Sequence, residues 1–223
     1  MAVIGNAFKH LCVMKYDFPI VVAAMYDRII AQLHSLIDSL RTRFILIAWG
    51  VKFGRGCRIV GPCYMRTRRV HDVKLGNGCL FVARPRFNMV GLTNATMIDT
   101  RSGGKIIVGD NSGFSGVVMS ARTLIEIGKN ARVGGNVRIY DHDFHSVDPE
   151  LRRTTKDGAG VKSKPVIIGN DVFIGTQAII LKGTRIGDRS IVAAGSVVFG
   201  LQIPTDSLVK GNPAQIVGRV AKE

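Results

Sequence analysis

A chain of 223 residues is long enough for one domain of ordinary size, with or without a short appendage. Glycine is frequent, at 26 residues, and aromatic residues are few, which favours many tight turns over a helical bundle. The formal net charge of +15 indicates a surface that attracts anions, and no basic tail accounts for it, so the charge belongs to the folded surface.

The first fifty residues carry no repeat, but apolar residues recur there at helical spacing. These residues are Ile29, Ile30, Leu33, Leu36, Ile37 and Leu40. With polar residues between them, they predict a helix over about Tyr26–Arg43. We expect residues 1–50 to form a helical cap on the fold that follows. The alternative is a helix that makes peripheral contact with a membrane, which Arg41, Arg43 and the apolar stretch FILIAWG favour.

The same region bears on where the protein resides. No apolar run reaches the length of a membrane span, since the segments around Phe18–Met25 and Phe44–Trp49 are too short. Asp17 and Pro19 interrupt the segment that most resembles a signal peptide. We therefore expect a cytoplasmic protein, with the inner membrane surface as its location if the helix binds lipid.

From about residue 51 onward, an apolar residue recurs every six positions. The longest series is Ile168, Ile174, Ile180, Ile186, Val192 and Val198, and shorter series are Phe53, Ile59 and Met65, then Leu75, Phe81 and Phe87, then Ile127, Val133 and Ile139. Four positions after most of these stands a small or β-branched residue. This period fits neither a helix nor plain strand alternation, and it predicts a β-solenoid of short strands and tight turns. Cys57, Cys63 and Cys79 occupy the small position, so we expect them in the core rather than at a metal.

One large interruption breaks the repeat between Ile139 and Ile168, a distance that is not a multiple of six. The segment begins YDHDFHSVDPELRR and continues through a polar, turn-rich stretch, which predicts a loop protruding from the solenoid at about residues 140–165. It contains His142 and His145. Loops on rigid scaffolds often carry function, so these two histidines are candidate site residues.

The repeat resembles that of the hexapeptide acyltransferase family, sugar O-acetyltransferase branch. The segment IIGNDVFIGTQAIILKGTRIGDRSIVAAGSVV follows the family motif, and LVKGNPAQIVGRV is similar to the family's C-terminal ending. The resemblance implies an all-β solenoid, namely a left-handed parallel β-helix over residues 51–220, assembled as a homotrimer. It also implies transfer of an acetyl group from acetyl-CoA to a sugar or glycan acceptor.

Within the interrupting loop, His145-x-x-Asp148-x-x-x-Arg152 matches the spacing of the family's active-site motif and places His145 on the catalytic histidine. His142 stays open as the alternative. A neutral imidazole can accept the proton of an attacking hydroxyl and hand it on to the leaving thiolate. Such a base needs an orienting partner, and Asp141, Asp143 and Asp148 are close in sequence.

The same resemblance implies where acetyl-CoA binds, along the groove between adjacent subunits of a trimer. By position Phe173, Thr176 and Ala194 match donor-site residues of the family, and the backbone amides of Gly175 and Ala194 are expected to donate to the pantetheine carbonyls. Phosphate contacts are expected from the basic residues Lys182, Lys210 and Arg219. We expect no metal, since after His145 the chain has no further histidine to complete a zinc site.

The acceptor is encoded less clearly. An acceptor on a bacterial surface polysaccharide or its precursor is the leading hypothesis, by resemblance. The basic residues Arg66, Arg68, Arg69, Arg84 and Arg86 could meet an anionic or lipid-linked glycan, or could equally form solvated edges. The alternatives are N-acetylation of an amino sugar and a non-catalytic solenoid that acts as a scaffold or binding protein. Nucleic acid is not expected, because aromatic residues do not alternate with basic ones on a repeated face.

Overall fold

The structure, a computed structural model, describes residues 18–100 and 102–220, so His10 and Cys12 lie outside the described residues. The chain divides into two units, Met1–Ile37 and Asp38–Glu223. Helix α2, Phe18–Ala48, is longer at both ends than the predicted helix. By length and composition alone, its Ile20–Ala48 stretch is long and apolar enough to cross a membrane, so the expectation that no segment reaches that length was wrong.

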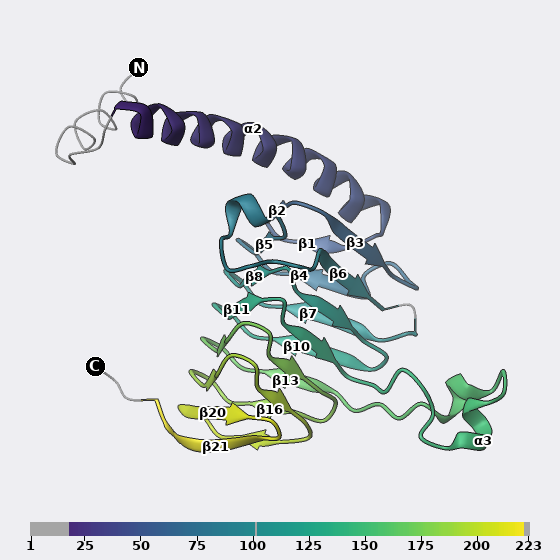
Figure 1. The fold of residues 1–223 in the computed structure, drawn as a ribbon. Helices are drawn as coiled ribbons and strands as arrows, with labels where there is room; N and C mark the ends of the chain where they lie inside the picture. Colours follow the sequence, from purple (N-terminus) through teal and green to yellow (C-terminus); the bar gives the residue numbers. More distant parts are fainter. Residues whose placement is uncertain (1–17, 101, 221–223) are drawn as a thin grey trace. The chain divides into compact units, whose positions relative to one another are not determined.

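The second unit is a stack of coils with three strands each, as the repeat predicts (Figure 1). Every third strand joins the same parallel sheet. Sheet A contains β1 (Lys52–Phe53), β4 (Val73–Leu75), β7 (Lys105–Val108), β10 (Leu124–Ile127), β13 (Val166–Ile168), β16 (Arg185–Ile186) and β19 (Gln202–Ile203). Sheet B contains β2 (Arg58–Val60), β5 (Leu80–Val82), β8 (Gly113–Ser115), β11 (Arg132–Gly135), β14 (Phe173–Ile174), β17 (Ile191–Val192), β20 (Ser207–Gly211) and the antiparallel β21 (Ala214–Arg219). Sheet C contains β3 (Cys63–Arg66), β6 (Thr96–Asp99), β9 (Val118–Ser120), β12 (Arg138–Tyr140), β15 (Ile179–Ile180) and β18 (Val197–Val198).

The core is filled by the residues of the six-residue period. In sheet A, Ile127, Ile168, Ile186 and Ile203 pair in register on successive coils, and all four are buried. The small positions lie at the corners, where there is no room for a large side chain. Their hydroxyls are satisfied locally, since Ser190 Oγ donates to a backbone carbonyl 2.9 Å away. Cys63 and Cys79 are buried as predicted, and Cys57 is half-buried.

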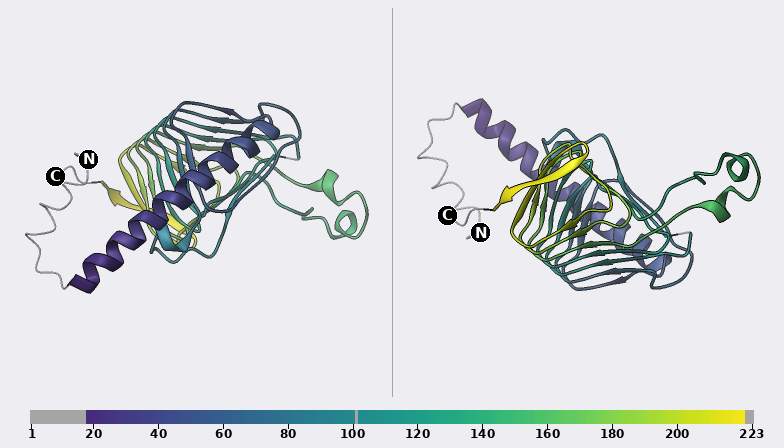
Figure 2. Two further views of the ribbon diagram at one scale, coloured as in Figure 1. Left: turned by 90° about the horizontal axis from the view of Figure 1, so that it is seen from above. Right: turned by 90° about the horizontal axis from the view of Figure 1, so that it is seen from below.

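Two excursions leave the coils. The predicted one follows β12 and carries α3 (Pro149–Arg152) and η2 (Asp157–Gly160), and Figure 2 shows it standing out from the stack. The other, between β5 and β6, was not foreseen. Phe87 belongs there to the short η1 (Pro85–Phe87) and not to a strand, so its place in the six-residue series was coincidental. Asn136 holds this excursion by accepting from the N–H groups of Thr93 and Asn94 and donating to Gly91 O.

The last turns of α2 pack on the first coil through three buried residues, Asp38, Thr42 and Leu46. Asp38 accepts from Gly61 N–H at 2.9 Å and forms a two-point ion pair with Arg84. An arginine fork on a buried carboxylate fixes both orientation and position. This end of the helix therefore covers the open core of the first coil, as a capping helix does.

Candidate active site

The excursion after β12 leaves the stack as a narrow stem. Asp141 lies at its base, fully buried, and its carboxylate accepts hydrogen bonds of 2.6–2.7 Å from the backbone N–H groups of residues 122–124. The two sides of the stem pair through Asp143 N–H donating to Lys162 O and Lys164 N–H donating to Asp141 O. A protruding loop held by a buried carboxylate and backbone pairs is positioned rigidly with respect to the coils.

His142 belongs to this stem. Its side chain is 6% exposed, its Nδ1 lies 2.9 Å from Asp141 Oδ1, and its ring packs 4.8 Å from that of Phe144. Lys182, from the next coil, forms an ion pair with Asp143 on the neighbouring stem position. His142 is thus enclosed by the elements that anchor the loop.

His145 lies beyond the stem, with a side chain that is 71% exposed. Its Nδ1 is 2.6 Å from Asp157 Oδ2, and the other oxygen of that carboxylate accepts from Ser146 N–H at 2.6 Å. The Ser146 hydrogen bond, followed by the one to His145, lowers the pKa of Asp157, so the carboxylate is charged at neutral pH. With Nδ1 held by Asp157, Nε2 is the nitrogen that the exposed ring presents to a substrate.

The structure gives the Asp and Arg of the His-x-x-Asp-x-x-x-Arg motif roles in the backbone of the loop, and Asp148 does not contact a histidine. Asp148, one of the three aspartates left open as partners, caps α3 by accepting from Glu150 N–H at 2.9 Å and does not contact the His145 ring. Arg152, one turn later, donates to Ser146 O at 2.8 Å. The motif therefore builds a short capped turn that fixes the backbone next to His145. The orienting residue is Asp157, which none of the sequence candidates included.

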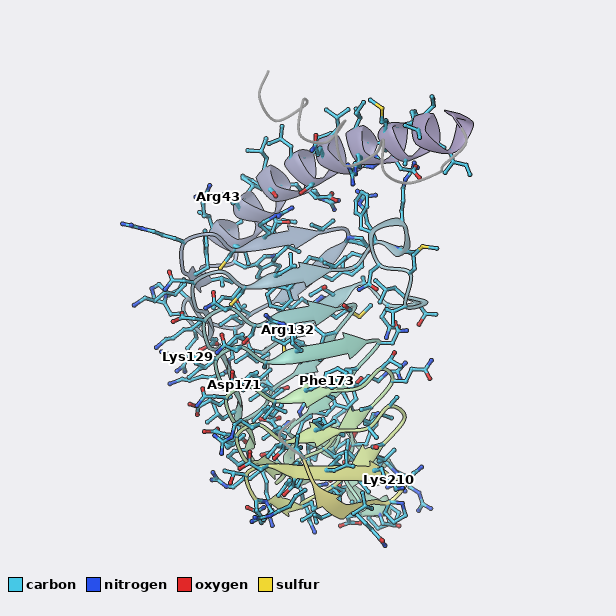
Figure 3. The ribbon with its side chains drawn as sticks, turned by 90° about the vertical axis from the view of Figure 1, so that its left-hand side faces the viewer. Arg43, Lys129, Arg132, Asp171, Phe173 and Lys210 are labelled. Carbon is cyan, nitrogen blue, oxygen red and sulfur yellow. The ribbon has the colours of Figure 1, made fainter. Side chains whose placement is uncertain are left out.

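A second group of candidate residues lies on the outer face of sheet B. One outward-facing row runs through successive coils, and it consists of Arg58, Leu80, Gly113, Arg132, Phe173, Ile191 and Leu208. Phe173 is 48% exposed, and Figure 3 shows it on the same side as Arg132 and Lys210. Because Gly113 contributes no side chain, a cavity of about 680 Å³ opens beside Arg132 and Phe173. Asn88 and Ser115 border it and share a 2.7 Å hydrogen bond.

The small residues predicted at the donor site have clear local roles. Gly175 is buried, and a Cβ there would lie 2.4 Å from Ala194 N, so only glycine allows the coils to approach this closely. Its own N–H donates to Val192 O at 2.7 Å, so this amide is already used and is not the pantetheine donor that we expected. Thr176 donates its hydroxyl to Gly135 O at 2.7 Å. Ala194 is exposed at the same corner.

The three basic residues predicted to contact phosphates lie in different settings. Lys182 is mostly buried, paired with Asp143 and placed 5.3 Å from the centre of the Phe199 ring, which gives it a part in anchoring the loop. Lys210 and Arg219 are exposed on the terminal hairpin of β20 and β21. The assignment of these three residues to phosphate groups stays a prediction.

The loop and the sheet B face lie on different sides of one chain. The loop leaves between β12 of sheet C and β13 of sheet A, whereas Phe173 is in sheet B. In a three-sided coil, the corner between two sheets lies opposite the third. Figure 1 shows α3 projecting from one side, and Figure 3 shows Phe173 on another. A single chain therefore does not bring His145 to Phe173.

Comparison with known proteins gives the class. Residues 165–199 match the family model described as the hexapeptide repeat of succinyl-transferase. A putative lipopolysaccharide biosynthesis O-acetyl transferase, WbbJ, of Escherichia coli K12 is 30% identical over 177 residues, covering 77% of this chain and 83% of that protein.

Solved structures agree with this match. A hexapeptide-repeat acetyltransferase of Vibrio cholerae, complexed with acetyl-CoA, aligns with a TM-score of 0.53 and 25% identity over 89% of each chain. A maltose O-acetyltransferase of Clostridium difficile 630 has the same fold, with a TM-score of 0.52, 24% identity, and 92% and 90% of the two chains covered.

The chain thus belongs to the hexapeptide-repeat acyltransferase family, and its three-sided coil is the left-handed β-helix of that family. It is an acetyltransferase by class, as the sequence predicted.

Proposed function

We propose that this protein transfers the acetyl group of acetyl-CoA to a hydroxyl of a sugar in a bacterial surface polysaccharide or its precursor, with His145 as the general base. The observation that carries the proposal is the His145–Asp157 pair, an exposed imidazole whose Nδ1 is held by a carboxylate at 2.6 Å. The similarity to an enzyme named for lipopolysaccharide biosynthesis supports the choice of acceptor.

The chemistry requires one nitrogen to accept and release a proton. Nε2 of His145 takes the proton of the acceptor hydroxyl while its oxygen attacks the thioester carbonyl carbon. The carbon–sulfur bond then breaks, the acetyl group stays on the acceptor oxygen, and the proton passes to the sulfur of CoA. Asp157 keeps the proton on Nδ1, which leaves a lone pair on Nε2, and stabilises the imidazolium while it lasts.

His142 suits this role less well. Its ring is almost fully buried, and the carboxylate that it contacts already accepts three backbone hydrogen bonds, at Asp141. A base must reach the substrate proton within hydrogen-bonding distance. We therefore assign His142 to the anchoring of the loop and His145 to the chemistry.

The site is shared between subunits of a homotrimer in this proposal. His145 protrudes at the corner between sheets C and A, and the donor-side residue Phe173 lies on sheet B of the same chain. A neighbouring copy can bring its sheet B face to the loop, with the acetyl-CoA arm between them and the phosphates near Lys210 and Arg219. Since the donor is made inside the cell, the reaction takes place in the cytoplasm, and a glycan precursor held at the inner membrane surface would meet the enzyme there.

The test is release of CoA thiol from acetyl-CoA against a panel of free sugars, sugar nucleotides, glycan precursors and amines. Wild type, His145→Ala and His142→Ala run in parallel, with thermal melting of each variant as the folding control. We expect turnover with a hydroxyl acceptor, and a loss of roughly 100- to 10,000-fold for His145→Ala, in the range that a general base contributes. Compared with His145→Ala, His142→Ala should show a smaller loss of kcat and a larger drop in melting temperature.

Three results would redirect the proposal. A loss of turnover confined to His142→Ala would identify His142, in the stem, as the base. Turnover with amino sugars alone would make the protein an N-acetyltransferase. Absence of turnover together with absence of CoA binding would favour a solenoid that serves as a scaffold.

A further inference from the structure

The helix-bearing end of the β-helix has an unusual distribution of charge. Between Asp38 and Lys74 the chain contains nine Lys and Arg residues but only two acidic residues. The nine cations, called here the basic end, are all exposed, and they are Arg41, Arg43, Lys52, Arg55, Arg58, Arg66, Arg68, Arg69 and Lys74. The two acids, Asp38 and Asp72, are 2% and 6% exposed and form hydrogen bonds inside the fold. The surface of this segment is therefore almost purely positive.

Large apolar side chains are exposed among these cations. Leu40, Phe44 and Ile47 on α2 are 64%, 74% and 67% exposed, and Trp49 follows the helix at 40%. Their spacing of three and four residues puts the helical ones on one face, away from the buried Leu46. A soluble surface rarely groups side chains of this size, so the group marks a contact with an apolar partner.

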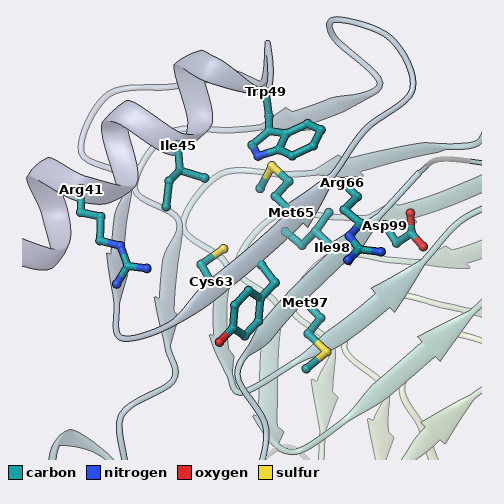
Figure 4. A pocket seen from close by; sticks show the side chains of 10 residues that line it. Arg41, Ile45, Trp49, Cys63, Met65, Arg66, Met97, Ile98 and Asp99 are labelled. Carbon is teal, nitrogen blue, oxygen red and sulfur yellow. The ribbon is translucent and has the colours of Figure 1, made fainter.

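A groove runs beside Trp49 between the end of α2 and sheet C. It has a volume of about 550 Å³, and its lining residues are mainly apolar, with Ile45, Met65 and Met97 among them (Figure 4). Arg41 and Arg66 lie at its edge, Arg66 next to Asp99. A groove that is apolar inside, with two arginines and one aspartate at its edge, has a net positive rim and the two chemistries of one ligand class, an acyl chain with an anionic head group.

We propose that the basic end binds the surface of a membrane rich in anionic phospholipid. The phosphates meet Arg66, Arg68 and Arg69, and the groove beside Trp49 receives part of an acyl chain. Each cation near an anionic membrane adds to the attraction, and apolar side chains next to the cations supply the second element that stable anchoring requires. A symmetric contact with a second copy would instead bring like charges face to face. The inference does not depend on the proposed reaction.

Trp49 provides a local probe, because it is the single tryptophan of the sequence. The full-length protein is titrated with phosphatidylcholine vesicles, and with vesicles in which roughly one third of the lipid is phosphatidylglycerol. Sedimentation measures binding, and the emission maximum of Trp49 reports whether its ring enters an apolar environment. We expect binding and a blue shift with the anionic vesicles only, and weakening as salt rises.

The decisive variant reverses three charges, Arg66→Glu, Arg68→Glu and Arg69→Glu. Its matched control reverses three exposed cations elsewhere, Lys105→Glu, Lys129→Glu and Arg185→Glu, so that both proteins have the same net charge. We expect the first to bind anionic vesicles at least about tenfold more weakly than wild type, and the control to stay within about twofold of it. Phe44→Ser with Ile47→Ser should keep the salt dependence and lose most of the blue shift.

Several outcomes would overturn the inference. Equal binding to both kinds of vesicle, an unchanged Trp49 spectrum, or an equal loss in the two charge-reversed proteins would each exclude a specific anionic-lipid site. If Phe44→Ser with Ile47→Ser changed the oligomeric state measured by light scattering, while wild type ignored vesicles, the apolar face would belong to another copy of the chain. Thermal melting of every variant separates these outcomes from unfolding.

Discussion

Replacing Asp157 by Asn tests whether a carboxylate orients His145. The Oδ1 atom of Asp157 accepts from Ser146 N–H, and its Oδ2 faces His145 Nδ1. Asparagine has one oxygen and one NH₂ group in these places. If its oxygen stays on Ser146, the NH₂ group faces Nδ1 and favours the tautomer with a proton on Nε2. That tautomer has no lone pair on Nε2 with which to accept a proton.

The expected loss of kcat depends on how far the His145–Asp157 pair is exposed to solvent. In buried triads, the same exchange of Asp for Asn lowers turnover by about 10,000-fold. The side chain of His145 is 71% exposed and that of Asp157 is 22% exposed, so water competes for their hydrogen bond and screens the charge. We therefore expect a smaller loss in kcat, roughly 10- to 100-fold, with little change in the KM for acetyl-CoA, because the exchange alters proton transfer and leaves the shape and size of the side chain unchanged.

The matched control is Asp148→Asn in the same loop. Asparagine is as good a helix N-cap as aspartate, so this variant should keep close to wild-type turnover. The assay is CoA thiol release with the best acceptor from the panel, repeated for Asp157→Asn in the His145→Ala background. Since both residues act as one unit, the second change should add little to the first.

Turnover of Asp157→Asn within about twofold of wild type would contradict an orienting role for Asp157, and so would an equal loss of activity in Asp148→Asn. Full additivity in the double variant would show that Asp157 acts separately from His145.

Three further predictions concern the packing of the coils and of the loop stem. Gly175→Ala would bring a Cβ within 2.4 Å of Ala194 N and should destabilise the fold by about 1–3 kcal/mol, measured by urea unfolding. Lys182→Met leaves the Asp143 carboxylate without its cation and should cost about 1–3 kcal/mol while lowering kcat through a looser stem. A hydrogen bond with the Cys79 thiol lowers the pKa of Cys57 to about 6. Because the thiolate is the reactive form, alkylation of Cys57 should stay near its maximal rate at pH 7 and slow below about pH 6.

Each of these has a contrasting variant or residue. Gly195→Ala has open space around the added Cβ and should cost only the strain of its positive φ, about 1 kcal/mol. Burial raises the pKa of Cys63 to about 12, so it should resist the reagent that modifies Cys57. Equal unfolding energies for the two glycine variants, or equal alkylation of the two cysteines, would contradict the packing described here.

The repeat was readable from the sequence because it is local. A buried aliphatic residue every six positions follows from the geometry of one coil, so Ile168 to Val198 could be placed in the core without any long-range information. Phe87 shows the limit of this reasoning. It fits the spacing by chance, and only the contacts of Asn136 with the chain before Thr96 reveal that this stretch leaves the coils.

The candidate site was harder to predict from the sequence, because the contact between His145 and Asp157 forms only when the loop folds back on itself. The spacing of the family motif pointed to His145, with His142 as the alternative, and Asp141, Asp143 and Asp148 were candidate partners only because they are near in the chain. Asp157 is twelve residues away, and only the turn through α3 brings it to the ring. An Asp-Gly pair in a polar stretch signals a turn, but nothing in it indicates a direction back to His145.

The arrangement also accounts for why such a loop interrupts the repeat at all. The inward side chains of a β-helix coil fill the core, so each coil adds only a few outward side chains to each sheet face. The row through Arg132 and Phe173 is an example. A base on the same coil would be restricted to those rows. A rigid stem closed by Asp141 lets His145 stand away from its own coils, where the sheet B face of another copy can meet it. In the proposed homotrimer, mixing His145→Ala with Phe173→Glu subunits should restore part of the activity that each variant lacks alone, because some interfaces then combine an intact base with an intact donor face. A site complete within one chain would show no such recovery.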